Sequence, residues 1–436
     1  MYDERAEAMP PDQRAALQED RLRGLVDRLL SGQGVQAQRL RESGINAGGD
    51  VGLDDLPRLP MTGKQDLWDA YPYGMLAVPA EQVVAVHGSS GTGGRPTLVG
   101  YTRADLNLWA QMCARSLACA GATAASTVHN AYGYGLFTGG TGIHQGSVQL
   151  GATVVPLSGG MTARQVRMLI DLQPDILTCT PSYAVRLGEA LAEAGLGSGQ
   201  LSLRAGLFGS EPWSEGLRTQ IEELLPLKAL DIYGLSEIIG PGVATECLEA
   251  QAGLHVNEDH FLVEAVDPHG GEPVADGAPG ELVFTTPTKE ALPLLRYRTG
   301  DIASLQRGAC ACGRTLVRMS KILGRRDDML VIRGVNVYPS EVERVLLADG
   351  RFSPHYQLVI DRRQASPRLM VACEEDAAGP TGPDAAAELQ RTLAETLGLR
   401  AQVQVLASGS VPRVEAGKAV RTVTWTEGEA PLPGLK

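Results

Sequence analysis

Between residues 80 and 240 the chain alternates short apolar runs with helical stretches, and this alternation constrains the fold most strongly. The apolar runs that end in turn residues are VVAVHG, ATVVPLSGG, DILTCTP, RAGLFGSEPW and KALDIYGLSE. Helical stretches such as ADLNLWAQMCARSLACAG and SYAVRLGEALAEAG lie between them. Strands that alternate with helices form βαβ units. We therefore expect an α/β fold with a mostly parallel sheet.

The pattern changes after residue 255, where closely spaced strands replace the alternation. HFLVEAV, GELVFTTP and IASLQR are separated by Gly/Pro turns, which predicts an antiparallel β section. Beyond GRRDD come a strand pair, a helix, two strands and a last helix, over about a hundred residues. We predict a large N-terminal domain over 1–326 and a small α+β C-terminal domain over 327–436. Leucines at helical spacing predict a further helix over 11–30.

Length and charge argue against several classes of protein. At 436 residues the chain is too long for a single hydrophobic core. The net charge of −12 argues against nucleic acid or an anionic membrane as the main partner. The N-terminus lacks the apolar region of a secretory signal, and no apolar run approaches the length of a membrane span. We therefore expect a cytoplasmic protein whose seven cysteines form no disulfides.

A glycine-rich stretch, HGSSGTGGRPT at residues 87–97, follows a predicted strand. Glycines let backbone N–H groups approach phosphate oxygens, because no Cβ blocks the way. Ser89, Ser90 and Thr92 add hydroxyl donors, and Arg95 adds a guanidinium that suits phosphate geometry. The Walker spacing is absent. Taken alone, the stretch fits either a surface turn or a phosphate-binding loop.

Other short stretches place polar groups where strands end. DIYGLSEIIG puts Tyr233, Ser236 and Glu237 at the end of a predicted strand, a usual position for functional groups in α/β sheets. RYRTGDI puts Asp301 just after a Thr-Gly pair. GRRDD and VEAGKAVR place basic residues beside glycine. Each of these stretches alone would also fit a solvated loop.

In this order, the stretches resemble the signatures of the adenylate-forming enzymes. These include acyl- and aryl-CoA ligases, carrier-protein adenylation domains and luciferases. Longer stretches look like the phenylacetate–CoA ligase branch, namely KQDLWDAYPYGM, YGYGLFTGG, GSEPW, TKEALPLLRYRTGD and IRGVNVYPSEVE. The resemblance extends from about residue 11 to residue 425. Two departures stand out: the usual second threonine and the lysine of the glycine-rich loop are Gly93 and Arg95, and one extra residue precedes Lys418.

The resemblance implies a two-step reaction with ATP. A carboxylate attacks the α-phosphate to give an acyl-adenylate and pyrophosphate, and the thiol of coenzyme A then displaces AMP. Glu237 would hold Mg²⁺, a hard cation that prefers oxygen ligands. Asp301 would accept the ribose hydroxyls, with Arg325 beside them. The β- and γ-phosphates would be held by Ser89, Ser90, Gly91, Thr92 and Arg95, and the adenine slot would be formed by Ser210, Glu211, Pro212, Asp231, Ile232, Tyr233, Gly234 and Ser236.

The resemblance also implies that the C-terminal domain is mobile. Lys418 would reach the α-phosphate and the carboxylate during adenylation and then leave. The domain would rotate about Asp327 between the two half-reactions, as a loop-borne hinge can. Gly334, Val335 and Asn336 would then line the channel for the thiol.

The cysteines allow a metal site. Cys310 and Cys312 form a C-x-C turn, while Cys247 and His255 could complete a tetrahedral Cys₃His zinc site. Three buried free thiols would explain the same cysteines. Some relatives in this branch carry a structural zinc at similar positions, which favours the metal site, with His260 as a reserve ligand.

The acid pocket is the part that the resemblance defines least. Glycines leave room for a flat ring and aromatic faces stack on it. We expect the organic part of an aryl acid to be surrounded by Tyr134, Phe137, Gly139, Gly140, Ile238 and Pro241.

The acceptor and the exact acid remain open at this point. Phenylacetate is the first expected substrate, and amino- or hydroxybenzoates come next. The acyl group would go to coenzyme A, although the phosphopantetheine of an acyl carrier protein would use the same channel. A nucleotide-binding regulator without catalysis is a third interpretation, against which Glu237, Asp301, Arg325 and Lys418 argue. The oligomeric state is open, with a homodimer common among relatives.

Overall fold

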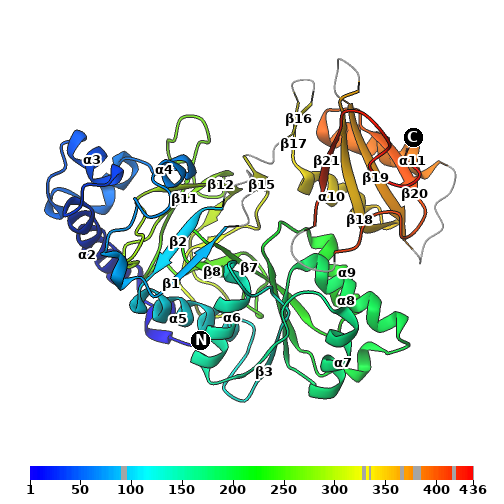
Figure 1. Ribbon diagram of the computed structural model, residues 1–436, viewed down its shortest axis with the longest axis horizontal. Coiled ribbons are helices and arrows are strands. Elements are labelled where there is room, and N and C mark those ends of the chain that lie inside the picture. The colour runs from blue at the N-terminus through cyan, green and yellow to red at the C-terminus, as the bar shows by residue number, and fades with distance from the viewer. Residues whose placement is uncertain are drawn as a thin grey trace.

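The computed structural model describes residues 1–89, 96–326, 330–332, 335–363, 368–376, 384–414 and 419–435. A larger N-terminal part and a smaller C-terminal part lie side by side (Figure 1). The chain begins with helices α1 to α4, at Glu4–Glu7, Pro11–Leu30, Val35–Glu42 and Lys64–Asp69. Short 3₁₀ helices lie at Gly48–Asp50, Leu53–Arg58, Ala80–Gln82 and Ser198–Gln200. Within the described residues, no helix has the length and apolar character needed to cross a bilayer.

A nine-stranded sheet forms the centre of the N-terminal part. One half of it is parallel and runs in the order β7-β6-β5-β3-β4. Its strands β3 to β7 lie at Thr127–Asn130, Thr153–Pro156, Ile176–Cys179, Ala205–Gly209 and Lys228–Leu235. The helices α5 to α9 lie at Arg103–Cys119, Thr138–Leu150, Thr162–Leu172, Pro181–Glu193 and Glu215–Leu224. The predicted α/β fold with a parallel sheet is confirmed.

The two faces of the parallel half are covered by different helices. Neighbouring residues of one strand point to opposite faces, and Ile176 and Leu177 of β5 accordingly belong to separate cores. Leu177 packs in the core that α7, α8 and α9 share, whereas Ile176 packs with residues of α5 and α6. Strands buried on both faces explain why the sequence shows continuous apolar runs here.

The other half of the large sheet is antiparallel. It continues from β7 through β8, β9, β14 and β13, at Gly240–Thr245, Leu254–Val256, Arg318–Met319 and Leu305–Gln306. The turn from β7 to β8 is tight, because Gly240 has a φ of +98° and a Cβ on Gly234 would lie 1.8 Å from the Gly240 carbonyl oxygen. This turn holds residues 235–239, which include Glu237, against α5 and α6.

A second, four-stranded antiparallel sheet confirms the predicted antiparallel β section. Its order is β10-β11-β12-β15, at Leu262–Val266, Gly280–Thr285, Tyr297–Ala303 and Gly324–Arg325. The run VVAVHG, however, does not join the parallel sheet. Its strand β1 (Ala85–Gly88) pairs only with β2 (Leu98–Tyr101), in an antiparallel hairpin. The apolar run predicted the strand but could not specify its partner, because pairing depends on residues far away in the sequence.

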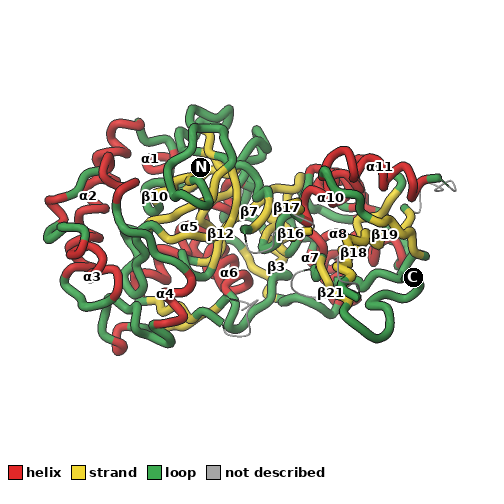
Figure 2. Tube along the Cα trace, turned by 90° about the horizontal axis from the view of Figure 1, so that it is seen from above, coloured by secondary structure: helices red, strands yellow, loops and turns green. Residues whose placement is uncertain are grey.

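The C-terminal part has its own sheet and its own hydrophobic cores (Figures 1 and 2). A hairpin of β16 (Leu330–Ile332) and β17 (Val335–Val337) comes first. A four-stranded sheet follows in the order β20-β19-β18-β21, at Gln402–Leu406, Arg368–Glu375, Phe352–Asp361 and Thr422–Trp425, with helices α10 and α11 at Pro339–Ala348 and Ala385–Leu397. The α+β character is confirmed, while the boundary between 326 and 327 stays a prediction, because Asp327 lies outside the described residues.

Candidate functional site

A cavity of about 90 Å³ lies at the carboxyl ends of β6 and β7, next to β12 and β15. This edge is where α/β sheets usually bind ligands. The cavity brings together residues that are far apart in the sequence and that the motifs singled out, namely Ser210, Glu211, Pro212, Asp231, Ile232, Tyr233, Gly234, Asp301 and Arg325. Its other walls had no predicted role: Gly209 and Leu235 lie within the motifs, and Leu254, Met319 and Ile322 lie outside them.

Asp301 is the best-supported carboxylate at this cavity. Its Oδ2 accepts a hydrogen bond from the hydroxyl of Tyr233 at 2.8 Å, and its Oδ1 contacts the guanidinium of Arg325 at 2.7 Å. The strand pairing aligns Asp301 directly with Arg325, so the ion pair follows from the register of β12 and β15. Burial raises the pKa of the Tyr233 phenol well above its usual value, which keeps it a donor. The hydrogen bond and the ion pair therefore fix the Asp301 carboxylate at the cavity edge.

Asp231 also lines this cavity. Burial, together with the nearby carboxylate of Glu246, raises the pKa of Asp231 to about 7. Glu246 accepts hydrogen bonds from the backbone N–H of Asp231 and from Arg218, which also pairs with Glu215. Arg218 and Glu246 were not predicted from the sequence, because nothing in the local pattern indicates that these charges are buried.

The glycine-rich loop begins beside the turn that carries Glu237. Ser89 lies at the end of β1, and its N–H donates to the carbonyl of Thr97 at 3.0 Å. The hydroxyl of Ser236 donates to the carbonyl of Gly88 at 3.2 Å, which ties the start of the loop to this turn. The other predicted phosphate ligands, Ser90, Gly91, Thr92 and Arg95, lie outside the described residues.

Glu237 is buried, and a buried lysine supports its backbone. The ammonium of Lys289 donates to the carbonyl of Glu237 at 3.0 Å and lies 5.1 Å from the ring centre of Tyr101. Burial lowers the pKa of Lys289 to about 8, while Asp105 and Glu237 act in the opposite direction. Lys289 lies in one of the motifs, but no role was predicted for it from the sequence.

The predicted acid-pocket residues lie in the loop before α6, in the first turn of α6, in the turn before β8 and at the start of β8. Phe137 is exposed at the start of α6, and the hydroxyl of Tyr134 accepts from Asn130 at 2.8 Å. Gly139 lies 3.4 Å from the ring of Tyr132, measured from the position a Cβ would take. Ile238 is fully enclosed in the core. Their role as acid contacts stays a prediction, as it does for Gly140 and Pro241.

The metal-site residues come together in the N-terminal part. One ligand atom from each of Cys247, His255, Cys310 and Cys312 lies within 4.8 Å of the others. The sulfurs of Cys247 and Cys310 are 3.8 Å apart, and the sulfur of Cys312 lies 3.5 Å from Nε2 of His255.

The reserve ligand His260 was wrong. Its ring contacts Asp259 at 3.2 Å and Thr288 at 2.9 Å, away from the cysteines.

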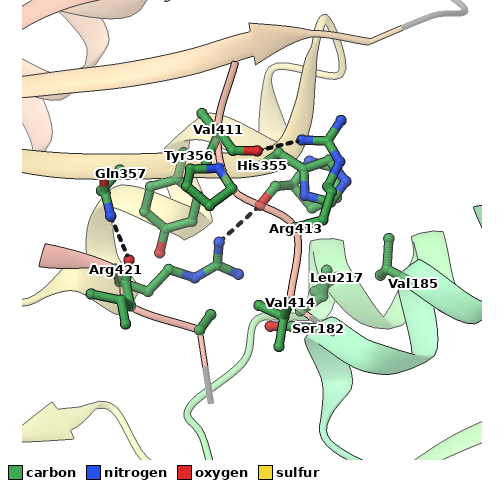
Figure 3. A pocket seen from close by; sticks show the side chains of 14 residues that line it. Ser182, Val185, Leu217, His355, Tyr356, Gln357, Val411, Arg413, Val414 and Arg421 are labelled. Carbon is green, nitrogen blue, oxygen red and sulfur yellow. Dashed lines mark hydrogen bonds between the residues drawn. The ribbon is translucent and has the colours of Figure 1, made fainter. Parts of the chain in front are cut away.

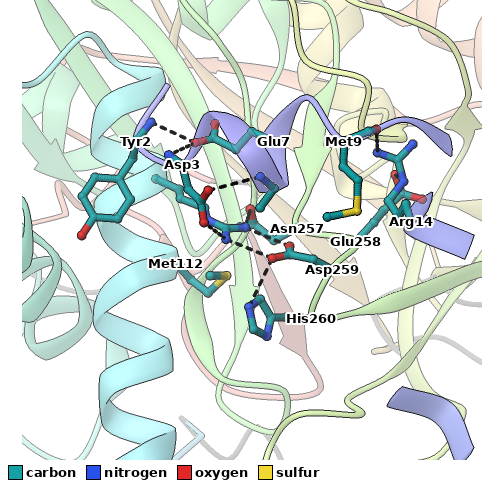
Figure 4. Close-up of polar contacts among 12 residues, drawn as sticks. Tyr2, Asp3, Glu7, Met9, Arg14, Met112, Asn257, Glu258, Asp259 and His260 are labelled. Atoms are coloured by element: carbon teal, nitrogen blue, oxygen red, sulfur yellow. Dashed lines mark hydrogen bonds and ion pairs between the residues drawn. The ribbon is translucent and has the colours of Figure 1, made fainter. Parts of the chain in front are cut away.

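The N-terminal segment covers the cysteine loop. The carboxylate of Glu7 accepts from Arg314 at 2.6 Å, two residues after Cys312, and both side chains are buried. Close by, Arg115 pairs with both Asp259 and Asp3, and Figure 4 shows these two carboxylates beside Glu7. These pairs attach the first residues of the chain to α5 and to the cysteine loop.

The residues expected to act from the C-terminal part are only partly described. Lys418, Asp327 and Gly334 lie outside the described residues, and Val335 and Asn336 form β17. The residue after Lys418 is described: the N–H of Ala419 donates to the carboxylate of Glu211 at 2.8 Å. The predicted adenine-slot residue Glu211 therefore contacts both parts of the molecule.

Comparisons with known proteins agree with this arrangement. The family model of AMP-binding enzymes matches residues 36–289, and that of the AMP-binding enzyme C-terminal domain matches residues 334–424. The phenylacetate–coenzyme A ligase of Thermus thermophilus is 49% identical, with 97% of this chain and 99% of that protein covered. The corresponding ligase of Escherichia coli is 46% identical, with 94% of each chain covered.

Solved structures agree in both parts of the molecule. A 2-hydroxyisobutyryl-CoA ligase in its postadenylation state has a TM-score of 0.89 at 29% identity, covering 96% of this chain and 91% of that one. The same ligase in its thioesterification state has a TM-score of 0.72 at 30% identity, covering 97% and 92%. The chain is an AMP-forming ligase that uses ATP to join an acid to coenzyme A through an acyl-adenylate. By sequence and by fold, it belongs to the phenylacetate–coenzyme A ligase family of the adenylate-forming enzymes.

Proposed function

We propose that this chain activates an aryl acid of the phenylacetate type and transfers it to coenzyme A. The observation that carries the proposal is Asp301, a buried carboxylate held by Arg325 and Tyr233 at the edge of a cavity. A carboxylate held by two donors is preorganised to accept the two ribose hydroxyls of ATP. Relatives of similar length that are phenylacetate–CoA ligases support the choice of acid.

In the proposed first step, the protein must stabilise charge that develops on phosphate oxygens. Lys418 would place its ammonium at the α-phosphate, while Ser89, Ser90, Gly91, Thr92 and Arg95 hold the β- and γ-phosphates. Arg325 keeps Asp301 oriented toward the ribose. In the second step, the thiol would approach along residues 334–336.

Glu237 fits a magnesium ligand. Among the described residues, no donor contacts its carboxylate, and its backbone is fixed by Lys289. Bound Mg²⁺ would bridge and neutralise phosphate oxygens of ATP.

The Cys₃His cluster fits a structural zinc. Tetrahedral zinc with Zn–S bonds of about 2.3 Å places two sulfurs about 3.8 Å apart and a sulfur and a nitrogen about 3.6 Å apart. The two distances in the cluster are 3.8 Å and 3.5 Å. Burial lowers the pKa of His255 to about 3, so the ring is the neutral form that metals bind. With four protein ligands, such a metal would hold together the loops of the antiparallel half of the large sheet and take no part in catalysis.

The arrangement of the two parts is proposed to be the one used for adenylation. Its support is the closer likeness to the postadenylation state of the 2-hydroxyisobutyryl-CoA ligase than to the thioesterification state of the same enzyme. The proposal also includes a cytoplasmic location, where thiols stay reduced. We also propose that the protein forms a homodimer, which is tested by measuring the mass of the purified chain in solution.

The test is acid-dependent release of pyrophosphate from ATP, measured across a panel of aryl acids with and without coenzyme A. The expected result is release with phenylacetate and formation of a thioester once coenzyme A is added. Release without a thioester product would assign the acyl group to a carrier protein. Preference for an amino- or hydroxybenzoate would correct the acid. No release with any acid, despite ATP binding, would support the regulator.

A further inference from the structure

Glu211 links the two parts of the molecule next to Lys418. Its Oε1 accepts hydrogen bonds from the N–H and the hydroxyl of Ser182, at 2.8 Å and 2.5 Å, in the first turn of α8. Its Oε2 accepts from the N–H of Ala419 in the C-terminal part, at 2.8 Å. A carboxylate at the N-terminal end of a helix is favoured by the unpaired N–H groups there. Because Ser182 of α8 holds Oε1, Oε2 is fixed in place and available to the C-terminal part.

Ala419 lines a cavity between the two parts of the molecule. The cavity has a volume of about 380 Å³ and is lined by residues of both parts (Figure 3). Ser182 and Leu217 lie on one side of it, and Tyr356 and Arg421 lie on the other (Figure 3). The open space of a cavity supplies no packing contacts. The hydrogen bond to Glu211 therefore anchors Ala419 to the N-terminal part.

The chain after Ala419 is anchored separately. Arg421 donates to the carbonyl of Pro354 at 3.0 Å and lies 4.4 Å from the ring centre of Tyr356, and its own carbonyl accepts from Leu358. These partners belong to the C-terminal part, so they move with it. Among the contacts of the described residues, the bond from Ala419 to Glu211 reaches the N-terminal part from the position nearest to Lys418 in the sequence.

Other contacts between the two parts lie further from Lys418. His355 contacts Glu189 at 2.6 Å, and the N–H of Ser214 donates to Glu343 at 3.0 Å. They attach the C-terminal part as a body, but they do not involve the residues next to the lysine.

We propose that Glu211 is a positioning residue for adenylation: its carboxylate docks the backbone next to Lys418 on the N-terminal part and releases it before the thioester step. The proposal rests on the proposed function, because it assigns Lys418 to the first half-reaction. It gives the Glu of the GSEPW motif a role distinct from contacting adenine. Hydrogen bonds to a carboxylate can be broken and re-formed in each cycle without exposing apolar surface.

The experiment compares the two half-reactions in the full-length protein. Acid-dependent exchange of pyrophosphate with ATP measures adenylation, and thioester formation from added acyl-adenylate and coenzyme A measures the second step. The variants are Glu211→Ala, Glu211→Gln and Lys418→Ala. Glu222→Gln is the matched control, since Glu222 also accepts a backbone N–H, that of Ala229 at 2.9 Å, but within the N-terminal part.

In Glu211→Ala, kcat of the exchange is expected to fall about 10- to 100-fold, as for loss of hydrogen bonds to a charged group. KM for ATP and the rate of the second step should stay within about twofold of wild type. Glu211→Gln should be intermediate, because one amide group cannot accept from both partners. Adding Glu211→Ala to Lys418→Ala should cause no further loss, because both changes act through the lysine.

Three results would overturn the proposal. Equal losses in both half-reactions would mean that Glu211 only maintains the fold, and unchanged exchange in both Glu211 variants would mean that the contact is dispensable. A raised KM for ATP at unchanged kcat would return Glu211 to the adenine slot. Absence of exchange in the wild-type protein with every acid would reject the proposed function itself, which is a separate outcome.

Discussion

The edge of the cavity that holds Asp301 and the contact surface of the C-terminal part are built in different ways. Asp301 and Arg325 lie on paired strands, and Tyr233 reaches them from a neighbouring sheet, so three rigid elements fix one carboxylate. The C-terminal part is attached by polar contacts at Glu189, Glu211 and Ser214 near a cavity, and by Leu347, which packs against the apolar core of α8 and α9. The carboxylate at the cavity edge is preorganised and stays in place, whereas the contacts of the C-terminal part can break and form again in each catalytic cycle. Variants at the two places should therefore affect different half-reactions.

Loss of the Cys₃His site should have the largest effect. Cys310→Ser removes one of four proposed zinc ligands. A ligand at about a thousand times its Kd stabilises the folded state by about 4 kcal/mol, so the melting temperature should fall by roughly 10 °C. Metal analysis should find one zinc per wild-type chain and less in the variant.

The cluster lies in the N-terminal part, which both half-reactions use. In Cys310→Ser, the activities in both half-reactions should therefore be lost together on heating. Cys373→Ser is the control, since Cys373 lies in the C-terminal sheet away from the cluster. A wild-type protein that contains no metal, with a melting temperature insensitive to chelator, would reject the zinc site.

Asp301→Asn should have the next largest effect. The amide keeps the size of the side chain but removes the charge that Arg325 and the ribose hydroxyls use. We expect kcat/KM for ATP to fall roughly 10- to 100-fold, the range for a hydrogen bond with a charged partner. Pyrophosphate exchange at varied ATP measures it. Asp276→Asn, at an exposed pair with Arg307, should change little, and an equal loss there would contradict the assignment.

A change at Gly216 should affect only the contact surface of the C-terminal part. A Cβ on Gly216 of α9 would lie 2.6 Å from the Cβ of Leu347 in the C-terminal part. Gly216→Ala should therefore hinder this arrangement at a cost of about 1 kcal/mol and slow adenylation roughly fivefold. The thioester step from added acyl-adenylate should keep its rate. Gly24→Ala on α2, where a Cβ meets nothing within 4 Å, is the control. Equal slowing of both steps would remove the distinction between the two regions.

The smallest effect is expected at Glu189. Burial raises its pKa, but the hydrogen bond and charge of His355, with Arg413 and Arg186, outweigh burial and lower the pKa below the usual 4.5. A lowered pKa means that Glu189 stabilises the fold above pH 4.5 and loses this contribution as the pH falls through the lower value.

Glu189→Gln should therefore lower stability by less than about 1 kcal/mol at pH 7. Thermal unfolding of both proteins measures the difference, which should shrink toward zero below pH 4.5. A difference that grows in acid would contradict the sign.

The sequence predicted local elements better than their partners. Leucine spacing with Pro11 at the start predicted the helix that the structure has at Pro11–Leu30. Cysteine spacing named the four residues that meet in the cluster. By contrast, VVAVHG was taken for a strand of the parallel sheet, and its pairing with β2 depends on residues that follow the glycine-rich loop.

The sequence could not predict which individual charged residues of the site are buried. Lys289 lies in a polar stretch, and only the folded chain brings it to the carbonyl of Glu237. Glu211 was expected at the adenine, and its second partner, Ala419, is 208 residues away. Contacts of this range have no local signature, because side-chain direction is set by packing of elements that are distant in the sequence.

The pairing of Glu7 with Arg314 has a consequence for the order in which the chain can fold during its synthesis. The two residues are separated by 307 positions. At about 5–20 residues per second, a ribosome needs roughly 15–60 seconds to make that length. Throughout that interval Arg314 is missing, and the Glu7 carboxylate can use the nearby N–H groups of Tyr2 and Asp3 as partners. The first helix of this structure therefore cannot be attached to the cysteine loop until Arg314 has been made.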